Sequence, residues 1–239
     1  MSIGIENSII RNAGALAEFY GKEAMEENTR GLYYAFRKDS NMFEKTFSKI
    51  FGLSYRLFFG NSDQKEIMLA LLEKYYRNEY FVKETFSRQI KRKDEGLTIR
   101  FELPVADSRV DILIPGRKNY AYEIKTEYDT LDRLSKQIDD YTKCFNYVYV
   151  VTFKGNENMV SSCIPENCGI MVYDRKAKFS IHKKACSCEV SPQIILNVMR
   201  KNERKSAFGM SDIDSIADCF SCDYICNAFG SAISSRTTE

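Results

Sequence analysis

Two carboxylates and an ammonium group lie at the ends of apolar segments within SRVDILIPGRKNYAYEIKTEYDT, residues 108–130. Asp111 stands at the start of one apolar run, and Glu123 and Lys125 close the next run, with eleven residues between the two acids. Side chains two residues apart on a strand leave the same face. The Pro-Gly pair at 115–116 indicates a hairpin turn, which would bring Asp111 back alongside Glu123. The spacing therefore predicts one charged patch on a sheet.

Clustered carboxylates of this kind are suited to a divalent cation, because they repel one another and are costly to bury without one. Glu102 lies in the polar phase of the preceding segment and is our candidate for a third carboxylate. Mg²⁺ takes one or two carboxylates together with water and phosphate oxygens. We therefore expect a Mg²⁺ site at Asp111, Glu123 and Glu102, with Mn²⁺ as a substitute. Lys125 could orient an attacking water or neutralise charge on a phosphate.

Alternating or continuous apolar segments must supply the sheet that positions these residues. They predict five strands, LTIRFELP (97–104), RVDILI (109–114), NYAYEIK (119–125), NYVYVVTF (146–153) and CGIMVYD (168–174). Between the third and fourth strands, residues 129–145 have the apolar period of a helix, with Asp129 as its expected N-cap. The order predicts an α/β fold with a mixed sheet flanked by helices.

Further helices are expected before and after this core. Residues 62–81 have a helical apolar stripe, whereas the polar stretch 87–96 is expected to be a loop. Two closing helices are expected near 191–203 and 211–229. We accordingly predict three parts, namely a helical N-terminal extension at 1–61, the core at 62–184 and a helical C-terminal extension at 185–239.

The block around Asp111, Glu123 and Lys125 resembles the PD-(D/E)XK nuclease superfamily. Gln137 and Tyr141 stand at the Gln-x-x-x-Tyr spacing that follows the catalytic lysine in RecB-like nucleases of that superfamily. The block also resembles a small, poorly characterised bacterial family that is assigned to the same superfamily. The shared features are an Arg-x-Asp strand, a Tyr-Glu-Ile-Lys strand and an Asp-Thr-Leu-x-Arg-Leu helix. The resemblance implies a restriction-endonuclease-like core.

The similar segment covers about residues 97–152, and it departs from the superfamily in one place. The residue before Asp111 is Val110, where the motif that names the superfamily has proline. The resemblance implies a Mg²⁺-dependent nuclease that hydrolyses phosphodiester bonds, with DNA as the expected substrate and RNA as the alternative. It assigns catalytic roles to five residues, Asp111, Glu123, Lys125, Gln137 and Tyr141.

The sequence also allows other interpretations of these residues. Arg109 and Arg133 are expected to contact nucleic acid, but salt bridges with Asp107 or Asp129 would explain them equally well. Tyr141 also continues the apolar stripe of its helix, so it could be a core residue. A second function class is a catalytically silent nuclease-like fold that binds nucleic acid or another protein.

The eight cysteines are expected to be reduced and structural, because the chain is too long for a disulfide scaffold. Cys219, Cys222 and Cys226 have a spacing that fits zinc or an iron–sulfur cluster. The apolar pattern of the surrounding residues 211–229 nevertheless predicts one amphipathic helix, in which thiols behave as small hydrophobes. We therefore expect no cluster there, and iron colour in the purified protein would show otherwise.

Composition sets the remaining expectations. The 35 basic and 33 acidic residues give a net charge of +2, so the sequence has no overall positive field that would demand nucleic acid. It shows neither a signal peptide nor an apolar run near the roughly 20 residues that cross a bilayer. We expect a cytoplasmic protein without a membrane partner, and a homodimer is left open.

Overall fold

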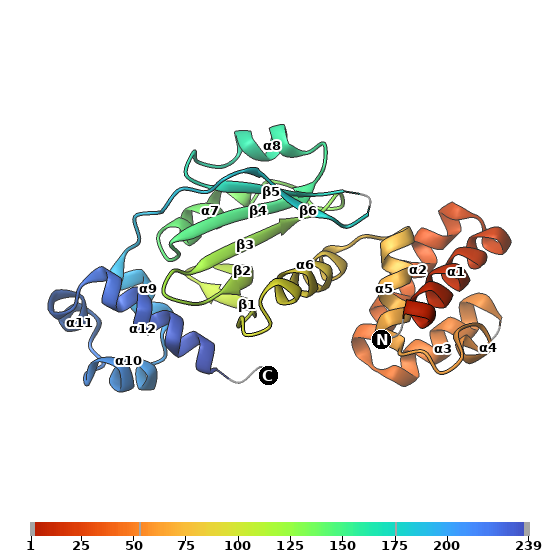
Figure 1. Ribbon diagram of the computed structural model, residues 1–239, viewed down its shortest axis with the longest axis horizontal. Helices are drawn as coiled ribbons and strands as arrows, with labels where there is room; N and C mark the ends of the chain where they lie inside the picture. The colour runs from red at the N-terminus through yellow and green to blue at the C-terminus, as the bar shows by residue number, and fades with distance from the viewer. Residues whose placement is uncertain (1–2, 53, 175, 237–239) are drawn as a thin grey trace. The chain divides into compact units, whose positions relative to one another are not determined.

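A six-stranded mixed sheet with helices around it is the centre of residues 82–239 (Figure 1). The computed structural model describes residues 3–52, 54–174 and 176–236. Contacts divide the chain into two units, Met1–Phe81 and Val82–Glu239. The predicted α/β class, with a mixed sheet flanked by helices, is confirmed. Within the described ranges, none of the helices is both long and apolar enough to cross a bilayer.

The first unit is helical, as predicted, and aromatic side chains fill its interior. Its helices are α1 (Ile3–Tyr20), α2 (Lys22–Lys38), α3 (Ser40–Phe51), α4 (Tyr55–Phe59) and α5 (Gln64–Tyr75). Phe43, Phe47 and Phe51 recur every four residues on α3 and are buried. The ring of Phe47 contacts those of Tyr55 and Phe59 on α4. Since α5 packs against α1 and α2, it belongs to this unit, whereas the predicted boundary after residue 61 places it with the core.

The helix predicted over 62–81 is interrupted, and that part of the prediction is wrong. Helix α5 ends at Tyr75, and Tyr76 leaves helical geometry with φ −154° and ψ 81°. The side chain of Asn78 accepts a hydrogen bond from the backbone N–H of Phe81 at 3.1 Å. Asn78 thus begins a new helix as its N-cap.

This new helix, α6 (Glu79–Lys93), continues through most of a predicted loop. The loop predicted at 87–96 is therefore wrong as far as Lys93. Arginine, lysine and glutamine are good helix formers, and basic residues in a last turn interact favourably with the helix dipole. Val82 and Phe86 are buried four residues apart and give the helix an inner face. Figure 1 shows α6 beside the strands β1 (Arg100–Val105) and β2 (Ser108–Ile114), with which Lys83 forms ion pairs.

The sheet has its strands in sequence order. They are β1 (Arg100–Val105), β2 (Ser108–Ile114), β3 (Tyr120–Lys125), β4 (Tyr147–Phe153), β5 (Gly169–Tyr173) and β6 (Phe179–Lys183). The first three strands form an antiparallel meander, β3, β4 and β5 are parallel, and β6 is antiparallel to β5. Strand β6 is not among the five predicted strands. Most of its side chains are exposed or half-buried, so it lacks the apolar pattern of a core strand.

Helix α7 (Leu134–Thr142) packs against β2 and β4, and α8 (Glu157–Ser162) packs against β4 and β5. The expectation that Asp129 caps α7 is wrong. Asp129 instead accepts hydrogen bonds from the N–H of Thr126 at 2.7 Å and from its hydroxyl at 2.6 Å. These bonds close a turn directly after β3, and the next helix, α7, begins only at Leu134.

Four helices close the chain where the sequence predicts two. They are α9 (Pro192–Val198), α10 (Lys201–Phe208), α11 (Ile213–Cys219) and α12 (Cys222–Ser235). The helix predicted over 211–229 breaks at Ser221, whose hydroxyl caps α12 by accepting from the N–H of Tyr224 at 3.3 Å. These helices share one hydrophobic core with the sheet. Arg100 of β1 donates to the carbonyl oxygens of Ile233 and Ser234 and so fixes the end of α12.

All eight cysteines are free thiols. Cys226 is buried, and burial raises its pKa to about 11. Cys219 and Cys222 are exposed, because they lie on either side of the break between α11 and α12. The continuous buried stripe predicted for these three cysteines is therefore wrong for two of them.

Replacing Cys219, Cys222 and Cys226 together with serine should lower the free energy of unfolding by about 1–2 kcal/mol, as expected for loss of a small buried hydrophobe. Most of this loss should come from the buried Cys226. Urea denaturation of the triple variant, compared with a Cys219→Ser/Cys222→Ser double variant of nearly wild-type stability, measures the difference. Stoichiometric zinc or iron that is lost in the triple variant would show that the thiols hold a metal.

Candidate active site

Three neighbouring strands place three acidic residues at opposing register positions. The register of β1 on β2 sets Glu102 opposite Asp111, and the register of β2 on β3, continued by one residue, sets Asp111 opposite Glu123. Carboxylate oxygens of Glu102 and Asp111 lie within 4.8 Å of each other. Glu102 has a φ of 55°, in the left-handed region that non-glycine residues rarely adopt. Such backbone strain is typical of functional sites.

Asp111 is buried, and both of its oxygens have partners. Its Oδ2 accepts a hydrogen bond from the N–H of Ile124 at 2.6 Å. Its Oδ1 lies 3.0 Å from the ammonium group of Lys83 on α6. Lys83 also forms an ion pair with Glu102. An ammonium group from α6 thus joins the first two carboxylates of the row.

Glu123 is only 2% exposed and is held by three side chains. Its Oε1 accepts from Lys125 at 2.9 Å and from the amide nitrogen of Gln137 at 2.6 Å. Its Oε2 accepts from the hydroxyl of Tyr141 at 2.9 Å. Lys125 also donates to the amide oxygen of Gln137 at 2.9 Å, which closes a ring of three side chains. The structure therefore brings together all five residues to which the resemblance assigns catalytic roles.

Tyr141 serves the core and the site at the same time. Its side chain is fully buried in the hydrophobic core, while its hydroxyl lies 2.7 Å from the carbonyl oxygen of Arg109 and 2.9 Å from Glu123. Burial, and next the Glu123 carboxylate, raise its pKa above the ordinary value for tyrosine. The phenol consequently stays protonated and acts as a hydrogen-bond donor, which makes Tyr141 a positioning residue for Glu123.

Tyr141→Phe should lower the free energy of unfolding by about 1–3 kcal/mol, because the buried Glu123 carboxylate loses one of its donors. Urea denaturation followed by circular dichroism measures this loss. The control is Tyr224→Phe, at a half-exposed position on α12. Equal stability of the two variants would contradict the assignment of the Tyr141 hydroxyl as a donor to a buried charge.

A groove with basic residues adjoins the carboxylates. It has a volume of about 570 Å³ and is lined by Pro104, Ala106, Asp107, Ser108, Arg109, Arg133, Lys136 and Gln137. Gln137 belongs both to this groove and to the ring around Glu123. The groove therefore reaches the ring around Glu123 through Gln137, and Arg109 and Arg133 belong to the same lining.

The two aspartates considered as salt-bridge partners of Arg109 and Arg133 are bound to other residues. Asp107 pairs with Lys136 at 3.3 Å, and Asp129 accepts from Thr126. Arg109 approaches Glu102 at 3.9 Å, and both side chains are well exposed, so this ion pair is weak. Arg133 is exposed at the N-terminus of α7. Both guanidinium groups can thus be reached by an anion in the groove.

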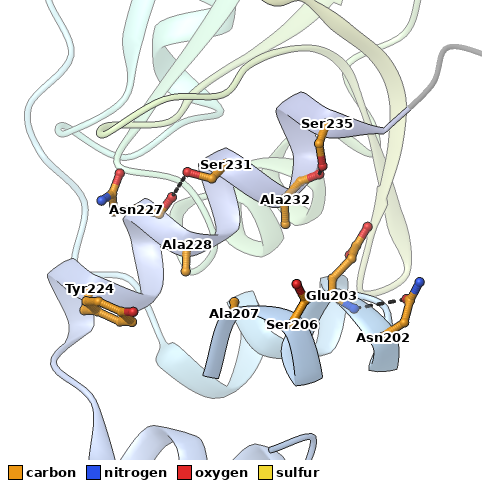
Figure 2. A pocket seen from close by; sticks show the side chains of 10 residues that line it. All are labelled: Asn202, Glu203, Ser206, Ala207, Tyr224, Asn227, Ala228, Ser231, Ala232 and Ser235. Atoms are coloured by element: carbon orange, nitrogen blue, oxygen red, sulfur yellow. Dashed lines mark hydrogen bonds between the residues drawn. The ribbon is translucent and has the colours of Figure 1, made fainter. Parts of the chain in front are cut away.

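A second groove lies between α10 and α12 and has a different character (Figure 2). Its volume is about 550 Å³. Among the described residues that line it, Glu203 is the one charged side chain, and it is bound to Arg236 at 2.7 Å. The hydroxyls of Ser231 and Ser235 bond back to carbonyl oxygens of their own helix. This groove offers no cluster of reactive groups.

Lys83 is a site residue that no sequence pattern indicated. It follows the buried residue Val82 on α6, and its own side chain is buried although it is charged. A lysine on the inner face of an amphipathic helix is an unusual feature that could have drawn notice. The signal was hidden because residues 82–86 lie between the helix predicted over 62–81 and the loop predicted at 87–96.

Comparisons with known proteins give a match to a family model and a match to a solved structure. Residues 72–237 match a family model described as bacteriophage P4 protein cII. A protein of unknown function from Silicibacter pomeroyi, of solved structure, matches with a TM-score of 0.34 and 13% identity, over 52% of this chain and 89% of its own. The curated proteins gave no match.

Proposed function

This chain belongs to the bacteriophage P4 protein cII family, and we propose that it is a Mg²⁺-dependent nuclease that hydrolyses phosphodiester bonds of DNA. On this proposal its sheet unit is a member of the PD-(D/E)XK nuclease superfamily. One observation carries it, namely that Asp111, Glu123 and Lys125 lie on the neighbouring strands β2 and β3, with Gln137 and Tyr141 bound to Glu123. The five residues come from three separate elements, β2, β3 and α7.

The row of carboxylates fits a hard divalent cation. Mg²⁺ binds oxygen at about 2.0–2.1 Å, which suits an ion shared between the oxygens of Glu102 and Asp111 that lie within 4.8 Å of each other. The ion pairs of Lys83 show that positive charge is already accommodated beside these two acids. Asp111, Glu102 and Glu123 are the proposed ligands. A bound Mg²⁺ would favour ionisation of the attacking water and neutralise charge on the phosphate.

The protein's own groups have distinct tasks in this proposal. The ammonium of Lys125 can donate to the attacking water or to a phosphate oxygen, because it reaches the same carboxylate that Gln137 and Tyr141 hold in place. Arg109 and Arg133 would bind backbone phosphates along the groove, and such contacts position a nucleic acid without reading its sequence. Binding should accordingly weaken as salt concentration rises.

A second candidate is the silent nuclease-like module, which would bind nucleic acid or a protein without turnover. The two ammonium groups favour it, since Lys83 and Lys125 already pair with the carboxylates of Glu102, Asp111 and Glu123. The patch can therefore be stable without a cation. The intact set of acids and lysine favours the nuclease, because a module that only binds phosphates has no use for buried acids beside them.

A cleavage assay on linear, circular, single-stranded and double-stranded DNA, and on RNA, separates the two candidates. We expect cleavage in Mg²⁺ that stops with EDTA and returns with Mn²⁺. DNA binding without cleavage under every metal condition would favour the silent module instead. An Asp111→Asn preparation, purified in parallel, controls for contaminating nucleases.

A further inference from the structure

Lys83 occupies the space between two of the proposed metal ligands. It lies on α6, and its side chain and that of Asp111 are each only 10% exposed. Its ammonium lies 3.0 Å from Asp111 Oδ1 and is paired with Glu102 Oε1. Removal of the ammonium would leave these two neighbouring carboxylates to repel each other.

The two lysines of the site divide the carboxylates between them. Lys125 contacts Glu123 and Gln137, whereas Lys83 contacts Asp111 and Glu102. Lys125 thus binds one proposed ligand, whereas Lys83 binds two, and those two have oxygen atoms within 4.8 Å of each other.

We propose that the Lys83 ammonium competes with the divalent cation for Asp111 and Glu102 and thereby sets the metal affinity of this site. This inference rests on the proposed function, because it takes these acids as metal ligands. An ammonium and a metal ion cannot both lie against the same oxygen atoms, since two positive charges at such short range repel strongly in a buried site. Metal binding therefore requires the Lys83 side chain to leave its two partners.

Lys83→Met tests the competition directly. Calorimetric titration with Mn²⁺ should give a dissociation constant at least tenfold lower than that of the wild type, because the competing charge is gone. The variant without metal should also melt at a lower temperature than the wild type, and Mn²⁺ should restore its melting temperature. A ligand that binds the folded state stabilises it in proportion to its affinity, so a variant that folds only with Mn²⁺ would likewise support the proposal.

The matched control is Lys143→Met, which removes an exposed lysine paired with Asp139 on α7. It should bind Mn²⁺ as the wild type does. A Lys83→Met protein that is folded and binds Mn²⁺ no more tightly than the wild type overturns the inference.

The pattern of results separates this inference from the proposed function. If the wild type binds Mn²⁺ and cleaves DNA while Lys83→Met binds Mn²⁺ equally well, only the role of Lys83 is wrong. If Lys83→Met gains Mn²⁺ binding that the wild type lacks, and the wild type does not cleave, the competition stands and the nuclease proposal falls. If neither protein binds Mn²⁺, both fail.

Discussion

Lys125→Met should abolish measurable DNA cleavage and leave Mn²⁺ binding largely intact. The lysine ammonium cannot ligate a cation, and its nearest partners are the Oε1 of Glu123 and the amide oxygen of Gln137. Loss of one such electrostatic contact to the reacting groups costs about 10²–10³ in rate. Because the substitution removes a positive charge beside a proposed ligand, Mn²⁺ should bind as tightly as before or somewhat more tightly.

Calorimetric Mn²⁺ titration together with a cleavage assay makes this measurement. Lys143→Met again provides the control, as an exposed lysine directly after α7 and outside the ring of Glu123, Lys125 and Gln137. Cleavage at the wild-type rate by Lys125→Met would show that the role assigned to the lysine is wrong. Loss of Mn²⁺ binding in this variant would instead mean that Lys125 holds Glu123 in its ligating position.

Asp111→Asn should lose both Mn²⁺ binding and cleavage. Asparagine preserves the size of the side chain and can still accept from the N–H of Ile124, but it removes the negative charge that a hard cation requires. Changes in groups that only support a metal ligand cost about 10- to 100-fold in affinity. Loss of a direct ligand should therefore cost at least as much.

The same titration and cleavage assay apply to Asp111→Asn. Asp139→Asn is the control, because Asp139 is an exposed acid that pairs with Lys143. Both variants should be folded, as judged by their circular dichroism. Undiminished Mn²⁺ affinity in Asp111→Asn would remove Asp111 from the ligand set and leave the nuclease proposal without its central residue.

The groove makes a weaker and separate contribution. Arg109 and Arg133 are exposed, and exposed charges that contact phosphates change affinity without entering the chemical step. Their replacement should alter DNA affinity and its salt dependence more than the rate at saturating DNA. Effects of this kind are smaller than those expected at Lys125 and Asp111.

The sequence alone determined the inner part of the candidate site. Glu123 and Lys125 share a strand face by the two-residue period, and the Pro-Gly turn sets Asp111 against Glu123. Gln137 and Tyr141 are one turn apart on a helix, so a single face of α7 presents both to Glu123. These relations follow from local periodicity and a short connection, and both can be read from neighbouring residues.

Only the tertiary structure decided which residues complete the patch. Lys83 meets Asp111 because α6 packs across the sheet, and no local pattern encodes that 28-residue separation. The left-handed φ of Glu102 and the shared core of α9 to α12 with the sheet likewise depend on distant partners. Lys83 is the counter-ion of Asp111 and Glu102 because it is buried beside them. The environment of a charged side chain is set by tertiary packing, which the sequence period does not encode.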